Sequence, residues 1–217
     1  MKRRLALILI TLTLPGLLMA DGWIGGKIGV GISTYDKDIK YYDKDIKYYD
    51  NTVTNVTGSD ISIDITGGGE HYFSNVFGIG YELGLGYPVA RKTGEGGYSW
   101  PQVRNMNFAA ALTAQFRWKI SDSFQLAAGA GASATFESTG IDIGGGAIKA
   151  DSCQVAFRAN LSMGFNVAQS VRLTFGSDFD VPVYTCSKVT QGGHLNQEIK
   201  DYKGFIATPY IAVAYTY

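Results

Sequence analysis

Large apolar residues and small or polar residues alternate along most of this chain. Between Phe77 and Tyr87, for example, every second residue is large and apolar, and most residues in between are glycine. A period of two places successive side chains on opposite faces of a β-strand. The pattern recurs in eight segments, at residues 24–33, 61–66, 77–87, 106–118, 124–136, 155–167, 171–183 and 205–217. The sequence therefore predicts an all-β protein whose eight strands each have one apolar face.

The lengths of the segments and connections favour a membrane barrel over a soluble sandwich, whose strands also alternate. Most segments reach the ~9–11 residues that a membrane-spanning strand needs, whereas soluble strands average ~5–6. Short connections at residues 74–75, 121–123 and 168–170 alternate with long polar ones at 36–60, 88–104, 137–151 and 185–203. Periplasmic turns and extracellular loops alternate in this way. We therefore expect an eight-stranded antiparallel up-and-down transmembrane β-barrel, with short periplasmic turns and four long extracellular loops.

The N-terminal residues have the features of a secretory signal peptide. A basic start at residues 2–4 precedes an apolar run over 5–18, and small Ala20 marks a cleavage site. The alternative, an N-terminal membrane anchor, needs ~20 apolar residues, which is longer than this run. We therefore predict a signal peptide at residues 1–20 and a single β-barrel domain at residues 21–217.

Composition narrows the class of function. The 217 residues include 19 Lys+Arg and 19 Asp+Glu, so the formal net charge is zero. A neutral chain has no field that attracts nucleic acid, so we expect no nucleic-acid partner. The mean hydropathy of +0.01 excludes a bundle of transmembrane helices.

Charged residues on the small or polar faces of the strands would point into the barrel. Isolated charges in a narrow lumen are costly, so we expect these side chains to pair. A hairpin centred on residues 168–169 places Arg158 between Asp178 and Asp180, which predicts a salt bridge and a plugged lumen. The predicted lumen charge cluster consists of Glu82, Arg117, Arg158, Arg172, Asp178 and Asp180, with Lys27 and Asp64 also predicted to face inward.

The two cysteines of the chain, Cys153 and Cys186, lie near the loop ends of neighbouring strands. The same hairpin register places Cys153 opposite about residue 184. An exported protein meets an oxidising compartment, so a disulfide between them is one prediction. Two free thiols are the alternative.

The last strand alternates over residues 211–217 and ends in the aromatic Tyr217. Together with residues 69–81, the signal peptide and the eight segments, it resembles the small outer-membrane β-barrel proteins of the OmpW, OmpX and OmpA-transmembrane types. The resemblance implies a protein of the bacterial cell outer membrane that contacts its lipid. It also implies that the barrel-assembly machinery reads the strand ending at Tyr217.

Few residues suggest catalysis. His71 and His194 are expected at opposite ends of the barrel, so they cannot share a metal ion, and neither has a nearby serine partner. We predict no catalytic, cofactor-binding or metal-binding residues. We expect a non-enzymatic protein whose loops serve adhesion, act as an antigenic surface or support envelope integrity, with a host or other extracellular ligand as partner. The alternative is a narrow OmpW-like channel for small or hydrophobic molecules.

The first long connection contains a tandem duplication. Residues 35–41 are repeated without change as residues 42–48. One interpretation is a tolerated expansion of a loop without a role of its own. The other is a tyrosine-rich surface that binds host molecules, because tyrosine offers contact area and a hydroxyl group at a low entropy cost.

Overall fold

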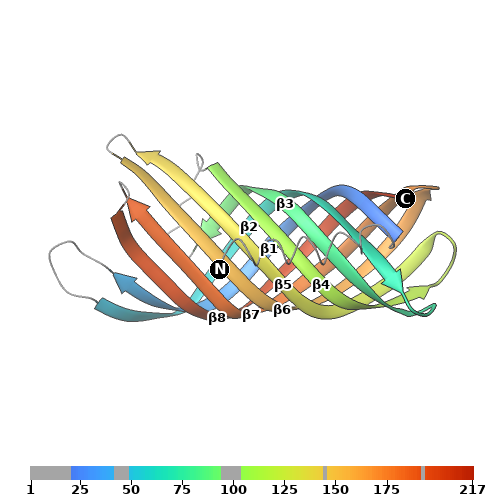
Figure 1. The fold of residues 1–217 in the computed structure, drawn as a ribbon, viewed down its shortest axis with the longest axis horizontal. Helices are drawn as coiled ribbons and strands as arrows, with labels where there is room; N and C mark the ends of the chain where they lie inside the picture. Colours follow the sequence, from blue (N-terminus) through green and yellow to red (C-terminus); the bar gives the residue numbers. More distant parts are fainter. Residues whose placement is uncertain (1–20, 42–48, 94–103, 144–145, 192–193) are drawn as a thin grey trace, which may run out of the picture.

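The computed structural model describes residues 21–41, 49–93, 104–143, 146–191 and 194–217. No helix within these ranges is long and apolar enough to cross a membrane. The ranges form eight antiparallel strands that run alternately up and down around one ring (Figure 1). The strands are β1 (Asp21–Tyr41), β2 (Tyr49–Tyr72), β3 (Phe77–Thr93), β4 (Arg104–Lys119), β5 (Phe124–Ile143), β6 (Gly146–Ala168), β7 (Val171–Gln191) and β8 (His194–Thr216). The predicted eight-stranded up-and-down barrel is confirmed.

The ring closes between the first strand and the last. β1 pairs with β8, with Ile24 opposite Tyr215 and Ile28 opposite Ile211. All other pairs join strands that follow one another in the sequence. Closure removes the two edges of the sheet, so the backbone N–H and C=O groups find partners on both sides of each strand. A sheet can cross hydrocarbon only in this closed form.

The large apolar side chains lie on the outside of the ring, and the inside is small or polar. Ile65, Met106 and Phe157 expose 66–68% of their surface. Among the described residues, the buried ones include charged residues, such as Lys27 and Asp178, which are 7% and 5% exposed as whole residues. A water-soluble protein has the opposite distribution. The distribution observed here is that of a barrel whose outer face meets lipid.

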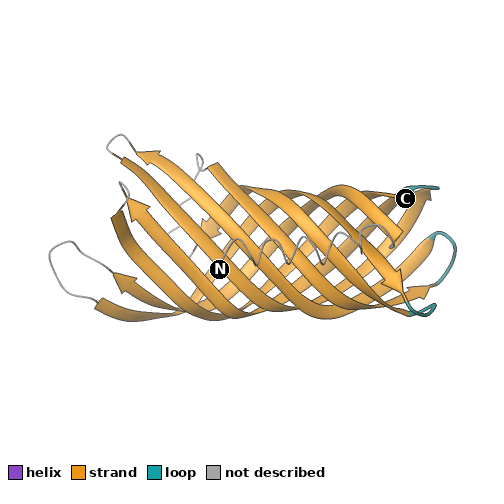
Figure 2. Cartoon of the chain, viewed as in Figure 1, coloured by secondary structure: helices purple, strands orange, loops and turns teal. Residues whose placement is uncertain are grey.

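Two of the short turns share a Ser-x-x-Phe sequence. The Ser74 hydroxyl accepts a hydrogen bond from the N–H of Phe77 at 2.9 Å, and that of Ser121 accepts one from Phe124 at 3.1 Å. In both turns the serine N–H donates back to the phenylalanine carbonyl. Each serine therefore supplies the local partner that reverses the chain. The connections β2–β3, β4–β5 and β6–β7 all lie at one end of the barrel (Figure 2).

The opposite end of the barrel corrects the predicted bounds of the four long connections. Most of residues 36–60, 137–151 and 185–203, and residues 88–93 of 88–104, continue the strands beyond the apolar band. The connections that remain, residues 42–48, 94–103, 144–145 and 192–193, lie outside the described residues. In water both faces of a strand can be polar, so the ladder continues there without the apolar alternation that marks a strand in a membrane. The first copy of the tandem repeat ends β1, and the second copy lies outside the described residues.

The β6–β7 hairpin has a different register from the predicted one. Arg158 lies directly opposite Asp180, because an irregularity between Asn166 and Ala168 shifts the pairing by one residue at the turn. A second irregularity lies further along the hairpin, where Val183 has no partner in the register. Together with the shift at the turn, this extra residue in β7 places Cys153 directly opposite Cys186 instead of residue 184.

Candidate functional site

Five charged side chains meet inside the barrel. Lys27 comes from β1, Glu82 from β3, Arg158 from β6, and Asp178 and Asp180 from β7. We call these five residues the central charge cluster. Each occupies an inward position of the alternating pattern, so the same period of two that exposes the apolar residues directs these charges into the lumen.

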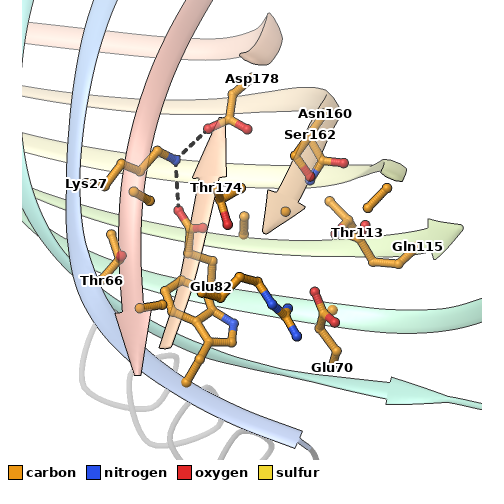
Figure 3. Close-up of a pocket in the computed structure, with 18 of the residues that line it drawn as sticks. Lys27, Thr66, Glu70, Glu82, Thr113, Gln115, Asn160, Ser162, Thr174 and Asp178 are labelled. Atoms are coloured by element: carbon orange, nitrogen blue, oxygen red, sulfur yellow. Dashed lines mark hydrogen bonds and ion pairs between the residues drawn. The ribbon is translucent and has the colours of Figure 1, made fainter. Parts of the chain in front are cut away.

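Lys27 holds two carboxylates together. Its Nζ atom lies 2.7 Å from Asp178 Oδ2 and 3.2 Å from Glu82 Oε1 (Figure 3). The ammonium group also lies 4.0 Å from the centroid of the Tyr210 ring on β8. The side chains of Lys27 and Asp178 are only 9% and 7% exposed. Charge-assisted hydrogen bonds and a cation–π contact therefore replace much of the hydration that the ammonium group loses.

Arg158 forms the second half of the cluster. Its Nε and Nη2 atoms donate to the two carboxylate oxygens of Asp180 at 2.9 and 2.8 Å. Nη1 lies 3.8 Å from Asp178 Oδ2, and the Ser133 hydroxyl donates to Asp180 Oδ1 at 2.8 Å. Asp178 thus connects Arg158 to Lys27. With Ser133 of β5 and Tyr210 of β8, the result is one continuous network across the lumen, built by six of the eight strands.

Glycines on the inner face make room for the larger lumen side chains. A Cβ atom on Gly176 would lie 2.6 Å from Cζ of Tyr210, a separation that side chains do not tolerate. A Cβ on Gly80 would lie 3.0 Å from Cγ of Gln115. These glycines leave space for the Tyr210 ring and the Gln115 side chain in an eight-stranded barrel, whose interior is narrow.

The central charge cluster separates two cavities. A cavity of about 110 Å³ lies on the turn side and a cavity of about 390 Å³ on the side of the strand extensions. Lys27, Glu82, Arg158 and Asp178 border both cavities, so they form the wall between them. An ion that moved from one cavity to the other would pass these charged pairs.

Two of the predicted lumen residues, Arg117 and Arg172, lie apart from the central charge cluster. Arg117 Nη1 is 3.9 Å from Glu70 Oε2, and its guanidinium carbon is 3.6 Å from the centroid of the Tyr72 ring. Arg172 Nε donates to Asn166 Oδ1 at 3.4 Å. Both arginines lie near the turn end of their strands, at a different height in the barrel from the cluster.

Sequence reasoning predicted that Lys27 faces inward, but it did not assign Lys27, Ser133 or Tyr210 to the charge cluster. Lys27 follows the inward pattern, since it precedes exposed Ile28 and lies between glycines, but its partners belong to strands distant in sequence. Ser133 and Tyr210 are uncharged, so a search for charges passes over them. Their roles become apparent only when the closed ring brings their strands together.

Comparison with known proteins bears on the fold. No protein-family model and no curated protein matches the sequence. Among solved structures, the outer membrane protein OprG from Pseudomonas aeruginosa is 13% identical with a TM-score of 0.50, over 90% of this chain and 96% of OprG. This chain has the fold of a small outer-membrane β-barrel protein. The resemblance seen in the sequence is confirmed at the level of fold.

Other small barrels are also similar to this one. A major outer membrane protein from Thermus thermophilus is 11% identical with a TM-score of 0.47, over 88% of this chain and 99% of that protein. Neisserial surface protein A is 11% identical with a TM-score of 0.44, over 88% of this chain and 97% of its own.

The outer-membrane barrel has an aromatic girdle at its turn end. Ring centroids of Phe73 and Phe77 are 6.1 Å apart, those of Phe77 and Phe116 are 5.2 Å apart, and those of Phe116 and Trp118 are 6.4 Å apart. Aromatic girdles of this kind mark the membrane–water interface. With the apolar band and the fold, the girdle confirms the predicted location in the bacterial outer membrane. The predicted signal peptide, residues 1–20, lies outside the described residues.

The remaining candidate residues of the barrel lie far apart or form pairs. His71 is near the turn end of β2, whereas His194 begins β8 at the other end. In the part of the chain that the structure describes, no three His, Cys, Asp or Glu residues are arranged to hold a metal ion. Cys153 and Cys186 are direct partners on β6 and β7.

Proposed function

We propose that this barrel is a non-enzymatic, non-conducting outer-membrane protein that presents its strand extensions outside the cell. The central charge cluster carries this proposal. Its Arg158, Asp178 and Asp180 side chains are 7–12% exposed, and their pairs close the lumen between the two cavities. Separating buried partners leaves uncompensated charges, so the closed lumen is strongly favoured. A barrel closed in this way acts through its surface.

The strand extensions offer a polar, ordered surface for an extracellular partner. The strands contain 16 to 24 residues, well beyond the ~9–11 that cross a membrane. On β6 the outward residues Lys149 and Asp151 form an ion pair of 2.9 Å with 58% and 51% exposure. Ser138 on β5 donates to Asp151 at 2.7 Å. Adhesion, an antigenic surface or envelope integrity would all use such a face.

The charge on this surface persists at neutral pH. Partial burial alone would raise the pKa of the Asp151 carboxyl. The hydrogen bonds from Ser138 and Lys149 and the charge of Lys149 outweigh this effect and hold that pKa below its usual value. Asp151 is therefore ionised wherever the outer surface of a bacterium is near neutral.

Planar-bilayer recordings test the closed lumen. We expect the purified barrel to give no discrete current steps, because the cluster blocks the path between the cavities. As a positive control, a variant with alanine at all five positions of the central charge cluster should conduct. Its current would show that inserted barrels are detected in the recording. Steady single-channel steps from the unaltered protein, abolished by the lumen-filling change Ala111→Phe, would instead favour the alternative of a narrow channel.

Labelling of intact cells tests the orientation. In a background with Cys153→Ser and Cys186→Ser, a membrane-impermeant maleimide should label Lys149→Cys on the extension. The matched variant Gln169→Cys, in the exposed β6–β7 turn, should be labelled only after the outer membrane is permeabilised. Equal labelling of both variants in intact cells, or the reverse order, would contradict the proposed presentation.

A further inference from the structure

Cys153 and Cys186 occupy opposed positions on adjacent strands. They are direct partners in the β6–β7 register, and both are free thiols in the structure. Opposed residues of an antiparallel pair have Cα atoms ~4.5–5.5 Å apart. A disulfide accommodates Cα separations of ~4.4–6.8 Å. The backbone therefore already has the spacing that a disulfide requires.

Both cysteines lie on the outer face of the barrel. Cys153 is opposite Phe136 of β5, which is 54% exposed, and it is two residues from Val155, which is 40% exposed. Cys186 is two residues from Tyr184, at 52% exposure, whereas its neighbour Thr185 is buried. The unpaired Val183 is what places Cys186 on this face, since without it the inward and outward positions beyond would exchange.

The pair also lies at the border of the apolar band. Below it, toward the turns, the outward residues are the apolar Val155 and Tyr184. Above it, the next outward pair is Asp151 opposite Lys188. The outer face thus changes from apolar to charged at the two cysteines, which places them at the membrane–water interface on the side of the strand extensions.

We propose that Cys153 and Cys186 form a disulfide that joins β6 to β7 at this rim, and that the bond forms in the periplasm before the barrel enters the membrane. The timing rests on the orientation proposed above. In the inserted barrel the two sulfur atoms lie at the outer surface, across the membrane from periplasmic oxidants. The β6–β7 hairpin must therefore meet its oxidant, and pair in register, before insertion.

The chemistry requires a periplasmic protein of the dithiol–disulfide oxidant class. One cysteine thiolate attacks a sulfur of the oxidant disulfide, which forms a mixed disulfide and releases one oxidant thiolate. The second cysteine thiolate then attacks its partner and displaces the oxidant as a dithiol. The pair loses two electrons and two protons to the oxidant, and one S–S bond replaces two S–H bonds. The bacterial periplasm maintains such oxidants.

Alkylation of the unaltered protein tests the bond. Cells are quenched in acid, and the unfolded protein is treated with a thiol-alkylating reagent. The mass of the protein is then measured by mass spectrometry. We expect no adduct on the mature chain before reduction and two adducts after it. As a control, Cys186→Ser should carry one adduct with or without reductant. Two adducts on the unreduced mature chain would overturn the disulfide.

Depletion of the barrel-assembly machinery tests the timing. The periplasmic precursor that accumulates should already lack free thiols. In a strain without the oxidant, the accumulated precursor should carry two free thiols. A reduced precursor that becomes oxidised only after insertion would overturn the proposed order. These readouts differ from the labelling of Lys149→Cys. If the labelling were reversed but the precursor were oxidised, only the proposed orientation would be contradicted. If the labelling were as expected but two free thiols remained, only the proposed disulfide would be contradicted.

Discussion

Replacing Arg158 with methionine is expected to lower the free energy of unfolding by about 3–5 kcal/mol, the usual loss when one partner of a buried ion pair is removed. Asp180 would keep the Ser133 hydroxyl as its hydrogen-bond donor but would lose both guanidinium bonds, at 2.9 and 2.8 Å. The Asp180 side chain is 7% exposed, so water can replace these bonds only in part. Urea unfolding followed by tryptophan fluorescence in lipid vesicles would measure the change.

The exposed Lys149–Asp151 pair provides a matched control for this prediction. Its separation is 2.9 Å, close to the 2.8 Å between Arg158 and Asp180, but its side chains are more than half exposed. Lys149→Met should therefore cost no more than about 1 kcal/mol. The double variant Arg158→Met/Asp180→Leu should recover part of the stability lost in Arg158→Met, because no carboxylate is left unpaired. Equal losses for Arg158→Met and Lys149→Met would show that the lumen is well hydrated and that the cluster is not a barrier.

The architecture could be predicted because a membrane constrains the residue types on both faces of a strand. Hydrocarbon requires apolar residues outside, and a narrow lumen requires small or polar residues inside, so Leu112 and Thr113 on β4 differ as the pattern demands. Leu112 is 60% exposed and Thr113 is 5% exposed. This constraint acts on every membrane-spanning strand, so the strand number, the faces and the short turns all follow from the sequence.

The same reasoning stops at the edge of the membrane. Beyond Cys153 the outward residues are Asp151 and Lys149, and their polarity is equally compatible with a loop or with a solvated strand. Polarity alone therefore predicted loops where the ladder continues. The register of β6–β7 could not be predicted from the sequence either, since an unpaired residue such as Val183 does not change the alternation that precedes it.

The central charge cluster shows a third limit, which is distance around the ring. The Arg158–Asp180 pair is local to one hairpin, so turn position and a period of two bring its members close together in a prediction. Lys27 instead bonds Glu82 and Asp178, which are 55 and 151 residues away along the chain. Those contacts require the β1–β8 closure and the stagger of all eight strands, neither of which a single strand encodes.

Leu112→Arg is expected to lower the free energy of unfolding in a bilayer by about 2–4 kcal/mol, the loss for an arginine near the middle of the lipid-facing surface of a barrel. Leu112 is 60% exposed and lies midway along β4 between the outward rings of Phe108 and Phe116. Ile120→Arg is the matched control, because Ile120 is 62% exposed but lies beyond the end of β4 in the turn, where a cation reaches water. Its loss should be about 0–1 kcal/mol. The difference in unfolding free energy between the two variants should shrink in lipids with shorter acyl chains, because the bilayer is thinner and the arginine reaches a headgroup more easily. Equal, small losses for both variants would mean that Leu112 does not face hydrocarbon, and the outer face of the ring would then have to lie against water or another protein.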